Sequence, residues 1–85
     1  MKLKDTFITH MSNGEQILVD ASGKFSGLIR NNESAAFIVD CLKQETTVEE
    51  IADKMYEEYD APREVLEKAV NDVVSSLRKA GAVDE

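Results

Sequence analysis

The sequence is poor in the residues that build reactive or metal-binding sites. Its 85 residues include one cysteine, one histidine and no tryptophan. A single cysteine excludes an internal disulfide and fits a reducing compartment, so we expect a cytoplasmic protein. One cysteine and one histidine also fall short of the roughly four ligands of a structural zinc site. We therefore expect neither a metal nor a cofactor.

Long apolar runs are missing as well. A membrane-spanning helix needs about 20 consecutive apolar residues, and no stretch of the chain approaches that length. Nothing in the chain resembles a signal peptide. The length suits one small domain covering residues 1–85, so we expect no membrane partner and no second core.

Candidate catalytic residues are equally scarce. Cys41 lies among apolar residues of a predicted helix, which is typical of a core thiol and not of a reactive one. His10 lies in the middle of a predicted strand, where we expect a surface or half-buried partner of the neighbouring strand. The glycines are scattered and form no phosphate-binding loop. The sequence thus predicts no catalytic residue and a protein that is not an enzyme.

The acidic charge is concentrated in one segment. The net charge is −7, and residues 45–60 hold seven acids and only one base, whereas the flanking segments are nearly balanced. Such a surface repels phosphate backbones, so the charge argues against a nucleic-acid partner. The acidic segment is either a solubilising face or a docking face for a basic patch on a partner enzyme.

Three short strands are predicted in the first third of the chain. Residues 5–12 and 15–20 alternate between apolar and polar side chains around Asn13-Gly14, a pair that favours the type I′ turn of a hairpin. The run "FSGLIRN" predicts a third strand over Ser26 to Arg30. No later stretch reads as a strand, which leaves one edge of this third strand without a partner in the chain.

Three helices are predicted in the remainder. Asn32 is the expected cap of a first helix that is apolar on nearly every side, as a buried central helix would be. Thr47 and Glu50 form a capping box for a second helix. The third helix is expected to open near Pro62 and to stop before Gly81. Its predicted core stripe consists of Leu66, Val70, Val73, Leu77 and Ala80.

This order predicts an α+β fold, a winged helix-turn-helix in which a three-stranded antiparallel sheet is followed by three helices. A winged-helix transcription regulator that binds DNA is the alternative function for this architecture. An acidic carrier protein is a third interpretation, but the chain lacks the Asp-Ser-Leu context of a modified serine, and Ser34 in "NESAA" is the nearest candidate.

The runs "FSGLIRNNESAAFI", "TVEEIADKMYEEYD" and "LRKAGAV" stand in an order and spacing that resemble the PqqD family of peptide-recognition domains. The resemblance covers residues 5 to 83. It implies a module without chemistry, which binds the leader segment of a ribosomally made precursor peptide and presents it to a modifying enzyme, often a radical S-adenosylmethionine enzyme. The leader would add as a strand beside the third strand, in the cleft against the third helix.

The resemblance implies a binding site in two parts. The strand part comprises Ser26, Gly27, Leu28, Ile29 and Arg30, unless these residues form an ordinary edge strand shielded by its short length. The helix part lies on one of two flanks, and we favour the flank with small side chains, because they allow close approach. The preferred residues are Val65, Ala69, Asp72, Val73 and Ser76, and the other flank holds Arg63, Val74 and Arg78. A monomer, or a weak dimer through the free strand, is expected.

Overall fold

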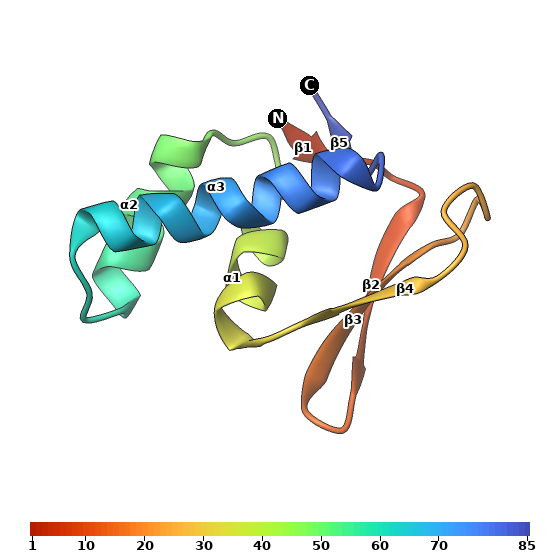
Figure 1. Ribbon diagram of the computed structural model, residues 1–85, viewed down its shortest axis with the longest axis horizontal. Coiled ribbons are helices and arrows are strands. Elements are labelled where there is room, and N and C mark those ends of the chain that lie inside the picture. Colours follow the sequence, from red (N-terminus) through yellow and green to blue (C-terminus); the bar gives the residue numbers. More distant parts are fainter.

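The computed structural model describes all residues, 1–85, and places five strands and three helices along the chain (Figure 1). A three-stranded antiparallel sheet is followed by three helices, so the predicted α+β class is confirmed. No helix is long and apolar enough to cross a membrane. The elements are β1 (Lys2–Leu3), β2 (Phe7–Ser12), β3 (Glu15–Asp20), β4 (Leu28–Asn31), α1 (Glu33–Cys41), α2 (Val48–Glu58), α3 (Arg63–Lys79) and β5 (Val83–Asp84).

The main sheet has the strand order β2-β3-β4, so β2 and β4 are its two edges. Asn13 and Gly14 have φ angles of 54° and 77°, which are the positive values that a type I′ turn requires. The predicted hairpin is therefore confirmed. The turn sets the register of β2 with β3, in which Ser12 lies opposite Glu15. On the other side of β3, Leu18 lies opposite Ile29 of β4.

One face of this sheet packs on the helices. Leu18 is fully buried there, and Ile29 packs against the same core. Because side chains alternate along a strand, Leu28 and Arg30 lie on the opposite face and are exposed. The core joins the sheet to all three helices, and its buried residues are Leu3, Phe7, Leu18, Ile38, Val39, Leu42, Ile51, Ala52, Met55, Leu66, Val70, Val74, Leu77 and Ala82.

The third strand begins later than predicted, at Leu28 instead of Ser26. Gly27 has a φ of 151°, a backbone conformation that side-chain-bearing residues rarely adopt and that interrupts the extended strand. The Asp20 carboxylate holds the preceding turn by accepting hydrogen bonds from the backbone N–H groups of Ser22 (2.9 Å) and Phe25 (3.0 Å).

The expectation that no later stretch forms a strand is wrong in one respect. β1 and β5 pair antiparallel, with Lys2 opposite Asp84 and Leu3 opposite Val83. Strands of two residues are too short to show an alternating pattern, so no sequence pattern marked them. They form a separate small sheet and do not extend the sheet at β4.

The helix caps follow the predictions. The Asn32 side chain accepts a hydrogen bond of 2.8 Å from the N–H of Ala35, and the Thr47 hydroxyl accepts one of 3.1 Å from the N–H of Glu50. Pro62 precedes α3 directly. The Asn32 and Thr47 caps satisfy N–H groups that have no partner within their helices, whereas Pro62 makes no side-chain cap bond. Of the predicted capping box, the bond accepted by Thr47 forms, and the Glu50 side chain does not accept from the N–H of Thr47.

Two burial predictions for the helices need correction. Within α1 only Ile38 and Val39 are fully buried, and Phe37 is only partly buried because this side of the helix borders an open groove. In α3, Val74 is fully buried whereas Val73 is only partly covered. The core therefore lies slightly to one side of the predicted stripe.

Candidate functional site

The outer edge of β4 presents backbone groups that no strand of the chain bonds. The N–H of Ala21 donates to the carbonyl of Thr6 over 2.7 Å, which marks these opposed residues as a hydrogen-bonded pair of the β2–β3 ladder. In an antiparallel ladder, hydrogen-bonded and non-hydrogen-bonded pairs alternate. By this alternation the backbone groups of Leu18 do not bond to β2, and they bond to Ile29 of β4 on the other side of β3. It follows that the backbone N–H and C=O groups of Leu28 and Arg30 point outward, away from β3.

The side chains along this edge form a mixed surface. Leu28 is 50% exposed. Arg30 is exposed, and its Nη1 lies 3.5 Å from a carboxylate oxygen of Glu15. Ser26 and Gly27 are exposed as well but lie before the strand, so they extend the edge without belonging to it.

The flanks of α3 differ in their neighbours. Arg63 forms ion pairs with Asp53 of α2 and with Glu67, so its flank is turned toward α2. The flank chosen from the sequence is turned away from α2. Of its residues, Val65 is 56% exposed, Ala69 is half-buried, and Asp72 and Ser76 are exposed.

Val73 lies between that flank and the core. It packs against the same buried cluster as Ile29 of β4, so the structure brings one residue of each predicted half of the site onto one core. Asp72 is held by Lys68, whose Nζ donates to it over 2.9 Å. None of the ten predicted residues lines the two larger hollows of the surface, so the assignment of the cleft stays a prediction.

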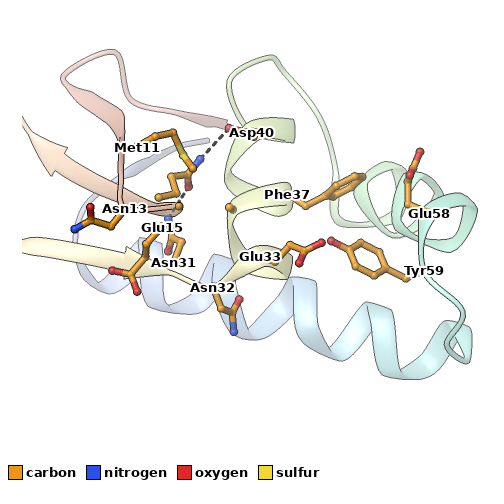
Figure 2. A pocket seen from close by; sticks show the side chains of 13 residues that line it. Met11, Asn13, Glu15, Asn31, Asn32, Glu33, Phe37, Asp40, Glu58 and Tyr59 are labelled. Atoms are coloured by element: carbon orange, nitrogen blue, oxygen red, sulfur yellow. Dashed lines mark hydrogen bonds between the residues drawn. The ribbon is translucent and has the colours of Figure 1, made fainter.

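The larger hollow, which we call the acidic groove, lies between the β2–β3 hairpin, α1 and the end of α2 (Figure 2). Its volume is about 800 Å³, and it reaches the C-terminal end of β4 through Asn31 and Asn32. Four carboxylates and no basic side chain line it. The lining residues are Met11, Asn13, Gly14, Glu15, Gln16, Asn31, Asn32, Glu33, Ala36, Phe37, Asp40, Glu58 and Tyr59.

A buried amide pair closes the inner end of the acidic groove. Gln16 and Asn31 are only 3% and 6% exposed, and Asn31 Nδ2 donates to Gln16 Oε1 over 2.8 Å. Gln16 Nε2 in turn donates to Asp40 Oδ1 over 3.0 Å, the contact drawn as a dashed line in Figure 2. This chain of bonds ties β4 and β3 to α1.

Aromatic residues form the outer end of the acidic groove. The rings of Phe37 and Tyr59 meet edge to face with centroids 5.6 Å apart. Burial raises the pKa of the Tyr59 hydroxyl, and the neighbouring charges of Glu33 and Glu58 raise it further. Glu33 and Tyr59 point toward each other in Figure 2.

The second hollow, which we call the lysine groove, lies where the turn before β4 meets the end of α3 and the N-terminal segment. Its volume is about 630 Å³. Its lining residues are Lys2, Leu3, Lys4, Asp5, Thr6, Phe7, Asp20, Ser22, Lys24, Phe25, Lys79, Ala80, Gly81 and Asp84. The sequence carried no signal for this groove, since its lysines are dispersed over the whole chain.

The side chains that most often bind metals or act as nucleophiles are few in this structure. No group of three or more His, Cys, Asp or Glu side chains is placed to hold a metal ion. The Cys41 thiol is half-buried, and burial raises its pKa, which lowers the fraction of reactive thiolate. His10 is exposed on β2, as expected for a surface residue.

Two solved structures share this fold. One is described as "TbiB1 in Complex with the TbiA(beta) Leader Peptide"; it is 20% identical, has a TM-score of 0.84, and the match covers 99% of this chain and 95% of that one. The other is "Lasso peptide synthetase B1 complexed with the leader peptide", with 21% identity, a TM-score of 0.81 and coverage of 99% and 96%. At this level of identity the likeness establishes the fold.

None of the curated protein sequences matches the chain. A family profile does: residues 15–83 match the one described as "Coenzyme PQQ synthesis protein D (PqqD)". The matched range begins at β3 and includes β4 and all three helices. The chain therefore belongs to the PqqD family.

Proposed function

We propose that this protein binds the leader segment of a ribosomally synthesised precursor peptide by β-strand addition to the free edge of β4. The observation that carries the proposal is the outward direction of the backbone groups of Leu28 and Arg30. In strand addition, main-chain hydrogen bonds provide much of the affinity, and alternate side chains provide specificity. The leader-peptide complexes formed by two proteins of the same fold support a leader peptide as the ligand.

Side-chain specificity would come from both faces of the added strand. Residues directly opposite each other in a sheet share a face. A leader residue opposite Ile29 therefore points toward the helices and contacts the flank formed by Val65, Ala69, Asp72, Val73 and Ser76. A leader residue opposite Arg30 lies on the outer face, where the guanidinium favours an acidic side chain.

The module presents the bound leader to a separate peptide-modifying enzyme, such as a radical S-adenosylmethionine enzyme, and contributes no catalytic group of its own. Membership of the PqqD family supports this division of labour. The free thiol of Cys41 fits a cytoplasmic setting. The module acts as a monomer or a weak dimer, and leader binding excludes a dimer that pairs two β4 edges, because such a dimer would block the leader site.

Titration calorimetry with synthetic leader segments of the short reading frames beside the gene tests the proposal. A strand of this length buries roughly 1,000 Å² and becomes ordered on binding. We expect micromolar affinity, about −8 kcal/mol, for one of these peptides. A complete lack of binding to all neighbouring leader segments, with the protein folded, contradicts the proposed function.

A further inference from the structure

The lysine groove concentrates the uncompensated positive charge of an acidic protein. The chain has seven lysines, of which Lys2, Lys43 and Lys68 are engaged in ion pairs. Four lysines remain unpaired, and all except Lys54 line the lysine groove. Of these three, one comes from the N-terminal segment, one from the turn before β4 and one from the end of α3, so the fold brings together Lys4, Lys24 and Lys79.

The acids of this groove compensate little of that charge. Asp5 pairs with Lys2 at 3.8 Å. Asp20 accepts hydrogen bonds from the turn that it organises, and these bonds lower its pKa and stabilise its charge locally. Asp84 is the third acid, and it has no ion-pair partner. Three free ammonium groups thus face one free carboxylate outside the turn.

Apolar surface lies between these charges. Phe25 is half-buried in the groove, and its ring lies 6.3 Å from that of Phe7, centroid to centroid. An occupant that fits must therefore combine negative charge with an apolar or aromatic side chain. Phe25 lies three residues before Leu28, so the groove lies beyond the N-terminal end of β4.

The other end of the same edge has the opposite charge. The acidic groove reaches Asn31 and Asn32, and its unpaired carboxylates are Glu33 and Glu58, since Glu15 pairs with Arg30 and Asp40 with Lys43. An acidic segment would be repelled there and attracted at the lysine end. The opposite charges at the two ends of the β4 edge thus favour one direction of a bound strand over the reverse.

We propose that the lysine groove binds an acidic segment containing an apolar residue, which flanks the edge-pairing strand of the leader on the Leu28 side. This inference rests on the proposed function for the identity of the occupant. The charge preference of the groove is a property of this chain alone and can be measured without a leader. This charge preference would fix the direction in which the leader strand is bound, because a leader bound in the reverse direction would place its acidic residues beside the acidic groove.

Amide chemical-shift mapping with short synthetic probes tests the groove. The acidic probe is acetyl-Phe-Glu-Glu-Glu-amide, and the matched control is acetyl-Phe-Lys-Lys-Lys-amide. We expect the acidic probe to shift the amides of Lys4, Lys24, Phe25 and Gly81, and the basic probe to leave them unchanged. The shifts should weaken between about 50 and 300 mM salt, because exposed charges are screened over the Debye length.

Charge reversal provides the variant test. The double variant Lys24→Glu with Lys79→Glu should weaken binding of the acidic probe at least about fivefold, since it removes and inverts two exposed charge contacts. Lys54→Glu is the matched control, because it reverses the charge of an unpaired lysine on α2 outside the groove. The affinity of this variant for the acidic probe should stay within about twofold of the unaltered protein's. Equal shifts with both probes, or equal weakening by both variants, overturn the proposal.

Three further outcomes separate the lysine-groove proposal from a phosphate site and from the proposed function. If inorganic phosphate causes the same shifts as the acidic probe at equal or lower concentration, the groove is a phosphate site and the proposal is wrong. If a cognate leader binds the double variant as tightly as the unaltered protein, leader capture stands but the lysine groove takes no part in it. Probe binding at the lysines without any leader binding would instead refute the proposed function and leave the charge preference of the groove intact.

Discussion

Asn31 donates a hydrogen bond of 2.8 Å to the side chain of Gln16, and both residues are buried beneath the C-terminal end of β4. Gln16 in turn donates a hydrogen bond to Asp40 of α1. The edge strand is thus fastened to the helical layer by side chains as well as by its backbone ladder with β3. A rigid edge suits strand addition, because it loses less conformational entropy when a peptide binds to it.

Replacing Asn31 with Ala should destabilise the fold by about 1–3 kcal/mol, because it leaves the Gln16 carbonyl oxygen buried without a donor. Urea unfolding measures this change. The combined variant Asn31→Leu with Gln16→Leu should be more stable than the sum of the single changes predicts, because it removes both polar partners. Strict additivity would mean that the two amides do not depend on each other.

The core is expected to respond unequally at two apolar positions. Leu18 is fully buried in the sheet, so Leu18→Ala should cost about 2–5 kcal/mol. Phe37 is half-exposed at the acidic groove, so Phe37→Ala should cost less, below about 3 kcal/mol. Unfolding curves of the two variants check the order. A larger loss at Phe37 would place the centre of the core on α1.

Acid should loosen the turn before β4. Hydrogen bonds from Ser22 and Phe25 lower the pKa of Asp20 below its ordinary value of about 3.9. Its contribution to stability is therefore complete above about pH 4 and is lost as the pH falls through the lowered pKa. Asp20→Asn should reduce the dependence of stability on pH in that acidic range. An unchanged profile between about pH 2 and 5 would show that the carboxylate does not hold the turn.

Duplex DNA should not bind near physiological salt. The acidic residues of α2 oppose a phosphate backbone, and of the basic residues of α3 Arg63, Lys68 and Arg78 are held in ion pairs. A gel-shift titration checks this expectation. Micromolar affinity for random-sequence DNA would revive the transcription-regulator alternative.

Proline substitutions distinguish the two edges of the sheet. Leu28→Pro removes an outward N–H from β4 and should abolish leader binding, while the helical circular dichroism stays largely unchanged. Met11→Pro is the matched control, because the register also turns the N–H of Met11 outward, on the opposite edge. We expect it to retain binding. Loss of binding only in the Met11 variant would place the leader on β2.

The sequence predicted the elements that have strong local signals. Asn13-Gly14 fixed the hairpin through its two positive φ angles, and Asn32 and Thr47 fixed the starts of two helices through their side-chain oxygens. These features depend on residues close together in the chain. For that reason the order of three strands and three helices was predictable.

Features that depend on long-range packing were not predictable. β1 and β5 pair across nearly the whole chain and are too short to show a period. Val74 replaces Val73 in the core because α2 and the sheet together decide which side of α3 is covered. The direction of the Leu28 amide follows only from the register of β3 with both of its neighbours. The lysine groove likewise exists only once its three chain segments meet.

The central claim is that a leader bonds to the outward backbone groups of β4, and amide hydrogen exchange at four consecutive residues tests it most directly. In the free protein, Ile29 and Asn31 should be protected by β3, whereas Leu28 and Arg30 should exchange rapidly. Addition of a saturating leader peptide should protect Leu28 and Arg30 and leave Ile29 and Asn31 as they were. If Leu28 and Arg30 continue to exchange rapidly in the complex while protection or shifts appear on Glu49, Asp53 and Glu57, strand addition is wrong and the acidic helix is the binding face.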